Sequence, residues 1–331
     1  MPGVALVTED CSALSAVVRA ALPRFGLDAE LPLAVIHQRE NAVFRLGAAE
    51  APLGVARVHR RGYRTSVEIR SELAWMEALR EAGVRTPPVC RGCDGDGVQT
   101  VAAPGSAELR DVTVLGWLDG TTLEEDASQE AYRLIGRTSA SIQAHGRQWA
   151  PPPWFSRPTW HVDALIGRDA LWGDYAALEV LSAAQLELMH RAAAIVRRRL
   201  DAFGRGPDRF GLTHGDLMPD NILMVDGAPV VIDFDDSGYG WYLYDLATLL
   251  AVKVGAPDYE LVREAWLEGY REVAALPEAH RALIDTLVMA RLLLGLGWMH
   301  TRRDTLLAQQ FTDMTVALAC WQAERVLAGE A

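Results

Sequence analysis

The strongest constraint on the fold of this chain is a change in its hydrophobic period near residue 120. Before that point apolar residues come in short runs of strand length, and after it they follow helical spacing. The first part predicts a short leading helix, then a five-stranded antiparallel sheet with one helix packed on it. The expected strands cover 33–36, 42–46, 53–59, 98–102 and 111–117, and the helices 11–22 and 66–82.

The second part is mainly helical, with one exception. Two short strands are expected at 222–225 and 229–232, because the turn residues Asp226-Gly227 separate two apolar runs. Helices are expected over much of the remainder, including 130–145 and 182–203. The chain therefore predicts an α+β fold of two lobes, a small β-rich lobe over 1–116 and a larger helical lobe over 117–331.

The composition excludes several classes of protein. The 44 acidic residues outnumber the 32 basic ones, so the net charge is −12, which argues against nucleic-acid binding. We find no signal peptide, and the most apolar stretch, 287–299, is shorter than the roughly 18 residues of a membrane span and contains Arg291. Cys90 and Cys93 have no second pair with which to form a zinc site. We expect a cytoplasmic protein that binds neither nucleic acid nor membrane.

One segment carries recognisable chemistry. The sequence HGDLMPDNIL begins at His214, and VIDFDD follows at 231–236. Together they match the H-x-D-L-x-x-x-N pattern of a kinase catalytic loop and the D-F of the metal-binding D-F-G, with Asp235 in place of the glycine.

The spacing suits phosphoryl transfer. That reaction needs a group that accepts the proton of the attacking hydroxyl and ligands for Mg²⁺ on the phosphates. Asp216 can serve the hydroxyl, while the hairpin after Asn221 returns Asp233 to the same metal. The alternative is a solvated acidic loop, since residues 201–240 hold eight aspartates. Against it, one of only two asparagines in the chain occupies the position that the motif requires, and apolar strands flank the acids.

These residues resemble those of the aminoglycoside phosphotransferase and choline kinase-like family, which has a protein-kinase-like fold. The chain is most similar to the branch of homoserine kinase type II and stress-response kinase A. The resemblance covers nearly the whole chain. Its motifs are HGDLMPDNIL (214–223), VIDFDDSGYGWYLYDLA (231–247), RENAVFRL (39–46), VARVHRRGYR (55–64), SELAWMEAL (71–79) and the late GY…LGWMHTRRD (269–304).

The resemblance implies roles for the residues of the catalytic segment. Asp216 is the catalytic base or the group that orients the acceptor, Asn221 and Asp233 hold Mg²⁺, and Asp235 reaches a second ion. His214 packs beneath the loop. For Asp245 two interpretations stay open, a brace for the catalytic loop and a helix N-cap.

On the nucleotide side the resemblance implies that Arg57 replaces the usual strand lysine, since the only lysine of the chain is Lys253. An arginine can bind two phosphate oxygens with its planar fork. Its expected partner is Glu72, with Glu68 as the competing candidate.

Three further residues complete the expected ATP site. Asn41 stands in a hairpin that would cover the phosphates, although it equally suits a turn. The backbone carbonyl of Gly116 and the N–H of Leu118 would meet the adenine edge, unless this is an ordinary strand end. Aromatic residues suggested as walls of an acceptor pocket, or alternatively as core, are Trp154, Trp160, Trp172, Trp241 and Tyr242.

We therefore expect a Mg²⁺- and ATP-dependent phosphotransferase that acts on a hydroxyl of a small, amine-bearing metabolite or antibiotic. The acidic balance suits such an acceptor. One alternative is a stress-response type Ser/Thr protein kinase, although the eleven residues between Asp233 and Asp245 leave no room for a long activation loop. The other is a non-catalytic nucleotide-binding module.

Overall fold

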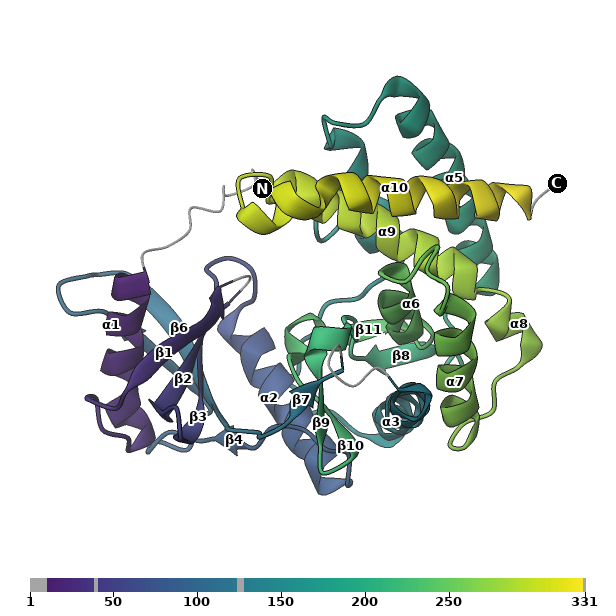
Figure 1. Cartoon of the computed structure of the whole chain (residues 1–331). Helices are drawn as coiled ribbons and strands as arrows, with labels where there is room; N and C mark the ends of the chain where they lie inside the picture. The colour runs from purple at the N-terminus through teal and green to yellow at the C-terminus, as the bar shows by residue number, and fades with distance from the viewer. Residues whose placement is uncertain (1–10, 39–40, 124–127, 330–331) are drawn as a thin grey trace.

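The computed structural model describes residues 11–38, 41–123 and 128–329. It has two lobes, a β-sheet lobe at the left of Figure 1 and a larger helical lobe at the right. This division agrees with the predicted fold class. The exact boundary near residue 117 stays a prediction, because the two lobes share part of their core.

The N-terminal lobe is built on one antiparallel sheet in the order β1-β2-β3-β6-β4, with β5 also paired to β6. All five expected strands are present, but the sheet has six. The additional strand β4 pairs Val89 with Leu115, and its two residues are too short to show a period. The strands are β1 (Leu33–Gln38), β2 (Ala42–Ala48), β3 (Ala51–Val58), β4 (Val89–Cys90), β5 (Val98–Ala102) and β6 (Leu109–Gly116).

Two helices flank this sheet and belong to different cores. Helix α1 (Cys11–Ala21), followed by the 3-10 turn η1 (Leu22–Phe25), buries its apolar side against the sheet. Helix α2 (Ser66–Glu81) instead packs its apolar side into the core of the helical lobe. Its Trp75 meets Phe234 edge-on at 5.7 Å between ring centres. Helix α2 therefore joins the two lobes.

The C-terminal lobe surrounds two small sheets, β10-β9-β7 and β11-β8. Strands β7, β8 and β11 were not predicted. β7 has only two residues, and β8 and β11 pair with each other without a turn signal of the kind that revealed β9 and β10. The elements are β7 (Thr121–Thr122), α3 (Gln129–Gln148), α4 (Val162–Ile166), η2 (Tyr175–Ala177), α5 (Ala183–Phe203), β8 (Phe210–Thr213), η3 (Pro219–Asn221), β9 (Ile222–Val225), β10 (Ala228–Val231), η4 (Phe234–Asp236), β11 (Gly238–Trp241), α6 (Tyr244–Ala251), α7 (Tyr259–Arg271), α8 (Glu278–Arg281), α9 (Ile284–Thr301) and α10 (Leu306–Ala328).

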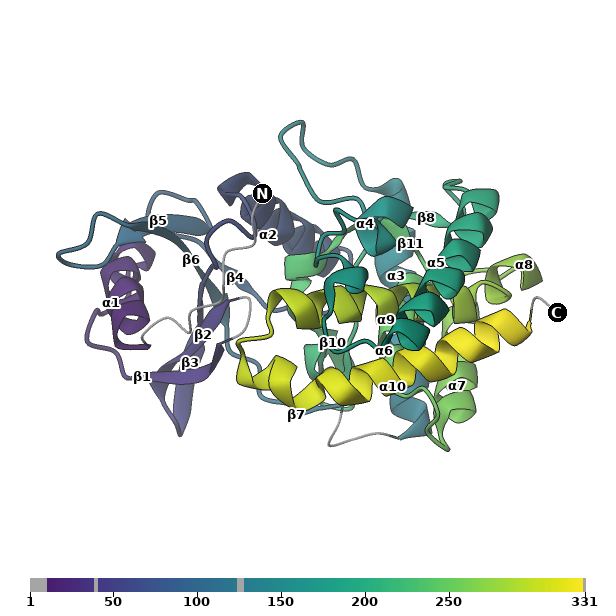
Figure 2. The same cartoon turned by 90° about the horizontal axis from the view of Figure 1, so that it is seen from above.

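Helix α9 is the central helix of this lobe and packs against α5, α6 and α10. Seen from above, α10 lies along the outside of α9 (Figure 2). The segment Glu278–Thr301 is long and apolar enough to cross a membrane by length and composition, and 61% of its most apolar window is buried inside the protein. Burial of this extent is typical of a helix in the core of a folded protein.

The small sheets position the catalytic segment. The hairpin of β9 and β10 turns at Asp226 and Gly227, both with positive φ, as the sequence predicts. It returns the chain beside its starting point, so that the amide N–H of Ile232 donates to the carbonyl of Asn221 at 3.0 Å. Pairing of β8 with β11 then brings the loop after β8 next to the turn before β11.

Candidate active site

A cavity of about 630 Å³ lies between the lobes. Residues of both lobes line it, and most of the predicted site residues are among them. The lining includes Asn41, Arg57, Gly116, Leu118, Asp216, Asn221, Asp233 and Asp235. Glu72 is fully buried behind Arg57.

Asp216 lies on the loop between β8 and η3, with both carboxylate oxygens held. Arg291 Nη2 donates to Oδ1 at 2.5 Å, and Asn221 Nδ2 donates to Oδ2 at 3.1 Å. The Asn221 amide also donates to the backbone carbonyl of Asp216 at 2.8 Å. Burial raises the pKa of Asp216 to about 6, and the Arg291 cation opposes that rise. The carboxylate is therefore mostly ionised at neutral pH.

His214 supports this loop from below and is fully buried. Its Nδ1 accepts a hydrogen bond from the Asp216 amide at 3.3 Å, so its Nε2 carries the proton and lies 3.0 Å from the carbonyl of Ile232. Burial lowers the pKa of His214. The ring is neutral and has the structural position that the resemblance implies.

Gly215 and Asp245 together fix the backbone of the catalytic loop. Gly215 has φ +83°, and a Cβ there would lie 2.5 Å from the carbonyl oxygen of Asp236, so no larger residue fits. Asp245 Oδ1 accepts from the Gly215 amide at 2.9 Å, whereas the N-cap of α6 is Leu243. The geometry thus favours the brace interpretation of Asp245.

Arg57 joins the two lobes at the other end of the cavity. Its Nη1 lies 2.6 Å from Glu72 Oε1, and its Nη2 lies 3.2 Å from Asp233 Oδ1 and 3.7 Å from Asp235 Oδ1. Burial acts to lower the pKa of Arg57, but the three carboxylates outweigh it and raise the pKa above its ordinary value. The competing candidate Glu68 forms the capping box of α2 with Thr65.

The carboxylates of Asp233 and Asp235, on the turn after β10, accept few hydrogen bonds from the described residues. Asp233 has φ +57°, and its side chain is 41% exposed. Asp235 is buried, and neither of its carboxylate oxygens accepts a hydrogen bond from any described residue. Burial raises the pKa of Asp233; Arg57 opposes the rise, and the negative charges of Asp235 and Glu72 add to it. These features fit a site that gains a cation.

A divalent cation would take its protein ligands from Asn221, Asp233 and Asp235. Among the described residues no group of three His, Cys, Asp or Glu side chains could hold a metal ion alone. The donors fit Mg²⁺, which typically uses one or two carboxylates together with phosphate oxygens.

The opposite wall of the cavity is apolar, as a nucleobase site requires. Gly116 ends β6 opposite Gly54, and its N–H donates to the carbonyl of Pro88 at 2.8 Å. Leu118 follows in the lining. Apolar side chains from both lobes complete this wall: Val43, Val55, Leu115, Leu223 and Ile232.

Asn41 lies at the edge of the cavity and is 6% exposed. Its Oδ1 accepts from the amide of Arg60 at 3.3 Å, which ties the start of β2 to the segment after β3. The tip of the expected hairpin, residues 39–40, lies outside the described residues.

Beyond Asp216 the cavity continues toward the C-terminal helices. The guanidinium carbon of Arg291 lies 4.4 Å from the centre of the Trp172 ring. Of the suggested pocket walls, Trp172 lines the cavity, Trp160 and Trp241 are core residues, and Trp154 is half exposed. The remaining wall comes from α9 and α10: Leu292, Trp298, Met299, Leu307, Met314 and Leu318.

Sequence reasoning missed the arginines that surround the catalytic segment. Arg64 Nη2 donates to Asp236 Oδ1, Arg157 Nη2 to the carbonyl of Asp235 and Arg291 Nη2 to Asp216 Oδ1, at 2.6, 2.6 and 2.5 Å. The one available signal was Arg291, a lone charge inside an apolar helix, which must be paired when buried. Arg64 and Arg157 stand in stretches with no comparable pattern.

A two-lobed fold with this catalytic loop, this acidic turn and a basic residue on the third strand defines a phosphotransferase of the protein-kinase-like class. A family model described as the phosphotransferase enzyme family matches residues 33–283, and the chain belongs to that family. The expected family and fold are thereby confirmed. The narrower branch suggested by the sequence stays a prediction.

Three similar proteins are informative. A structure of a microcompartment-associated aminopropanol kinase has 32% sequence identity and a TM-score of 0.86, and covers 95% of this chain and 97% of that chain. An amicoumacin kinase solved with AMP-PNP, Ca²⁺ and Ami has 20% identity and a TM-score of 0.74, over 94% of this chain and 93% of its own. Hydroxylysine kinase of Bos taurus is 25% identical over 235 residues, 64% of this chain and 60% of that protein.

Proposed function

We propose that this protein transfers the γ-phosphate of ATP, with Mg²⁺, to a hydroxyl group of a small, amine-bearing molecule. The observation that carries the proposal is the convergence of Asp216, Asn221, Asp233 and Arg57 in one cavity between the lobes. Arg57 lies on β3 of the N-terminal lobe and the other three lie on the catalytic segment of the C-terminal lobe, so their meeting is a property of the fold.

In the proposed reaction Asp216 accepts the proton of the acceptor hydroxyl. Arg291 and Asn221 fix the plane of its carboxylate, and its oxygens keep lone pairs that can accept that proton. General-base assistance of this kind contributes about 10²- to 10⁴-fold. Arg57 would turn its fork toward the phosphates while Glu72 holds it from behind.

Mg²⁺, held by Asn221, Asp233 and Asp235 with the phosphate oxygens, would neutralise charge on the phosphates. Gly116 and Leu118 would offer their backbone to the adenine, and Asn41 would lie at the phosphate edge. A relative solved with AMP-PNP and Ca²⁺ supports a nucleotide and a divalent cation in this fold.

An amine-bearing acceptor is supported by the relatives, since aminopropanol and hydroxylysine each carry an amine and a hydroxyl. Trp172 and Trp298 line the cavity beyond Asp216, and each has an arginine guanidinium over its ring, at 4.4 Å and 4.8 Å, so these ring faces suit a cation such as an ammonium group. The four cysteines, all free thiols, fit a reducing compartment such as the cytoplasm.

The protein-kinase alternative has less support. The residues between Asp233 and Asp245 are occupied by η4, β11 and the start of α6. No long segment remains there to order a protein substrate.

The test is ATP turnover with Mg²⁺ against amino alcohols, hydroxyamino acids, aminoglycosides and a generic protein substrate. We expect transfer to at least one amine-bearing small alcohol. Asp216→Asn should lower the rate of that transfer about 10³-fold, while Asp226→Asn, in the remote β9–β10 turn, should leave it intact. Wild-type protein that neither binds ATP nor transfers phosphate to any of them would refute the proposal, and transfer to protein alone would favour the protein kinase.

A further inference from the structure

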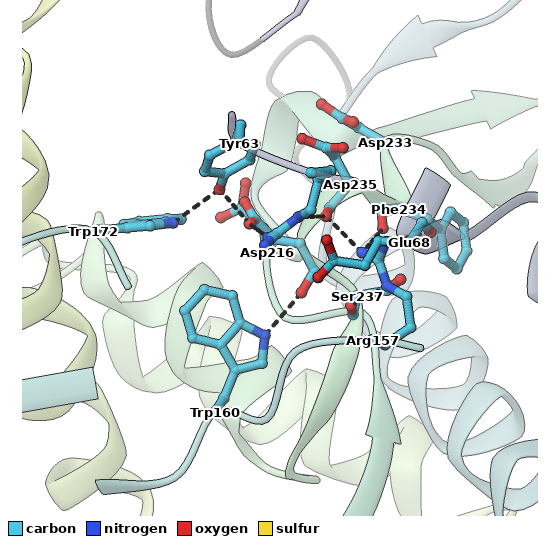
Figure 3. A network of polar contacts seen from close by, with 12 residues as sticks. Tyr63, Glu68, Arg157, Trp160, Trp172, Asp216, Asp233, Phe234, Asp235 and Ser237 are labelled. Carbon is cyan, nitrogen blue, oxygen red and sulfur yellow. Dashed lines mark hydrogen bonds and ion pairs between the residues drawn. The ribbon is translucent and has the colours of Figure 1, made fainter. Parts of the chain in front are cut away.

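The turn that carries Asp233 and Asp235 is held by side chains from outside the motif. The backbone carbonyls of residues 234–237 each accept a hydrogen bond from an arginine or tryptophan side chain. The donors are Arg157, Arg64 and Trp160. Figure 3 shows Arg157 and Trp160 approaching this turn.

Arg157 makes most of these bonds. Its Nε donates to the carbonyl of Ser237 at 2.7 Å. Its Nη2 donates to the carbonyls of Phe234 at 3.0 Å and Asp235 at 2.6 Å. The remaining Nη1 donates to the carbonyl of Glu68 in α2 at 2.9 Å. One guanidinium therefore fastens the turn to the helix that carries Glu72.

Burying the charged side chain of Arg157 at this position is energetically unfavourable. It is 7% exposed, and within the described residues its hydrogen bonds go to backbone carbonyls and not to carboxylates. A buried charge costs several kcal/mol in desolvation. The four hydrogen bonds to backbone carbonyls offset that cost, and three of these carbonyls belong to the turn that carries Asp233 and Asp235.

The segment that carries Arg157 is itself anchored on both sides. The amide of Ser156 donates to Ser71 Oγ at 2.9 Å, which ties the segment to α2. On the other side, the amide of Tyr239 donates to the carbonyl of Pro158 at 2.9 Å, and the amide of Trp160 donates to the carbonyl of Tyr239 at 2.7 Å. Because its backbone is fixed, Arg157 can impose a position on the turn.

We propose that Arg157 is a positioning residue for the divalent cation that accompanies the nucleotide. Asp233 and Asp235 lie on one turn, both within 4 Å of Arg57 Nη2, and neither oxygen of Asp235 accepts a hydrogen bond from a described residue. By fixing the carbonyls of the turn, Arg157 keeps both carboxylates placed for the metal. The inference rests on the proposed function, since it assumes that these carboxylates bind that cation.

The experiment compares full-length wild type, Arg157→Met and Arg157→Lys. Mn²⁺ serves as the spectroscopic probe, titrated by electron paramagnetic resonance in the presence of a non-hydrolysable ATP analogue. Loss of a residue that orients metal ligands typically weakens metal binding about 10- to 100-fold. We expect a weakening in this range for Arg157→Met and a smaller one for Arg157→Lys, with metal-free nucleotide affinity within about twofold.

The matched control is Arg110→Met. Arg110 is equally buried, at 6% exposure, and donates to the carbonyl of His59 at 3.2 Å. It also pairs with Glu108 at 3.7 Å and is not among the residues that line the cavity, so its loss should lower thermal stability and leave Mn²⁺ affinity unchanged.

Wild-type Mn²⁺ affinity in Arg157→Met, even with lowered thermal stability, would overturn the inference while the proposed function stands. If Arg157→Met does not fold, unchanged Mn²⁺ affinity in Arg157→Lys overturns it equally. A wild type that transfers no phosphate and binds no Mn²⁺ with nucleotide would instead refute the proposed function, and the inference with it.

Discussion

The two ends of the cavity hold their charges in different ways. At the nucleotide end Arg57 contacts three carboxylates from both lobes within 4 Å. At the acceptor end Arg291 lies between one carboxylate, Asp216, and the face of Trp172. Beyond it the wall is methionine, leucine and tryptophan.

In the proposed function, the nucleotide end therefore fixes the geometry of the reaction, and the acceptor end selects the acceptor molecule. A network of charges with several partners fixes geometry, since moving one member leaves buried charges unpaired. Methionine is flexible and adapts to different shapes. We therefore expect changes at the nucleotide end to alter nucleotide binding and the fold together, and changes at the acceptor end to alter acceptor binding alone.

The largest effect should come from Asp216→Asn. Asp216 lies where the nucleotide end and the acceptor end of the cavity meet. The amide keeps the size of the carboxylate but cannot accept the proton of the hydroxyl. We expect kcat to fall about 10³-fold, with the KM for ATP changed less than about twofold. Steady-state kinetics and a thermal melt measure this, and a kcat within tenfold of wild type would remove Asp216 from the role of base.

Arg57→Met should break the nucleotide end. It removes charge-assisted hydrogen bonds worth about 1.5–3 kcal/mol each, so we expect the KM for ATP to rise about 10- to 100-fold. It also leaves Glu72 and Asp233 unpaired and should lower the free energy of unfolding by about 3 kcal/mol. Unchanged ATP kinetics in a stable variant would show that Arg57 is only an interlobe tie.

Arg291→Met should test the same comparison at the acceptor end of the cavity. Asp216 would keep its bond from Asn221 but lose the one from Arg291. We expect kcat over the KM of the acceptor to fall about tenfold, the equivalent of one charged hydrogen bond, while the KM for ATP is unchanged. A rise in the ATP KM as large as that of Arg57→Met would erase the distinction between the two ends.

The smallest effect should come from Met314→Ala on α10. This side chain is 49% exposed and lines the acceptor wall. Its loss should change stability by about 0.5 kcal/mol or less and shift the KM of one acceptor against another a few-fold. Identical acceptor preferences in the variant would place the selective surface elsewhere.

Sequence reasoning succeeded where the determinants are close together in the chain. Asp216, Asn221 and Asp233 lie within one short stretch, and the Asp226-Gly227 turn that aligns them is a local signal. The strands of the first sheet were found for the same reason, because a short apolar run is visible within a few residues. The two-residue strands β4 and β7 offer no period and depend on their partners.

Contacts that join distant segments were harder to predict. Glu72 was the expected partner of Arg57 and does pair with it, but the choice against Glu68 depends on the rotation of α2, which the Thr65 capping box and the buried Ile69 and Leu73 set together. The bonds from Arg64 to Asp236 and from Arg291 to Asp216 span 172 and 75 residues. No local pattern encodes such pairs.

Arginine in place of lysine on β3 has a consequence for chemical labelling. Nucleotide-shaped acylating reagents capture kinases through a lysine amine beside the phosphates, and a guanidinium remains protonated and unreactive under the same conditions. The only lysine of this chain, Lys253, pairs with Asp258 at 2.7 Å and does not line the cavity. A survey of active kinases by such reagents would therefore pass over this protein, however much ATP it binds.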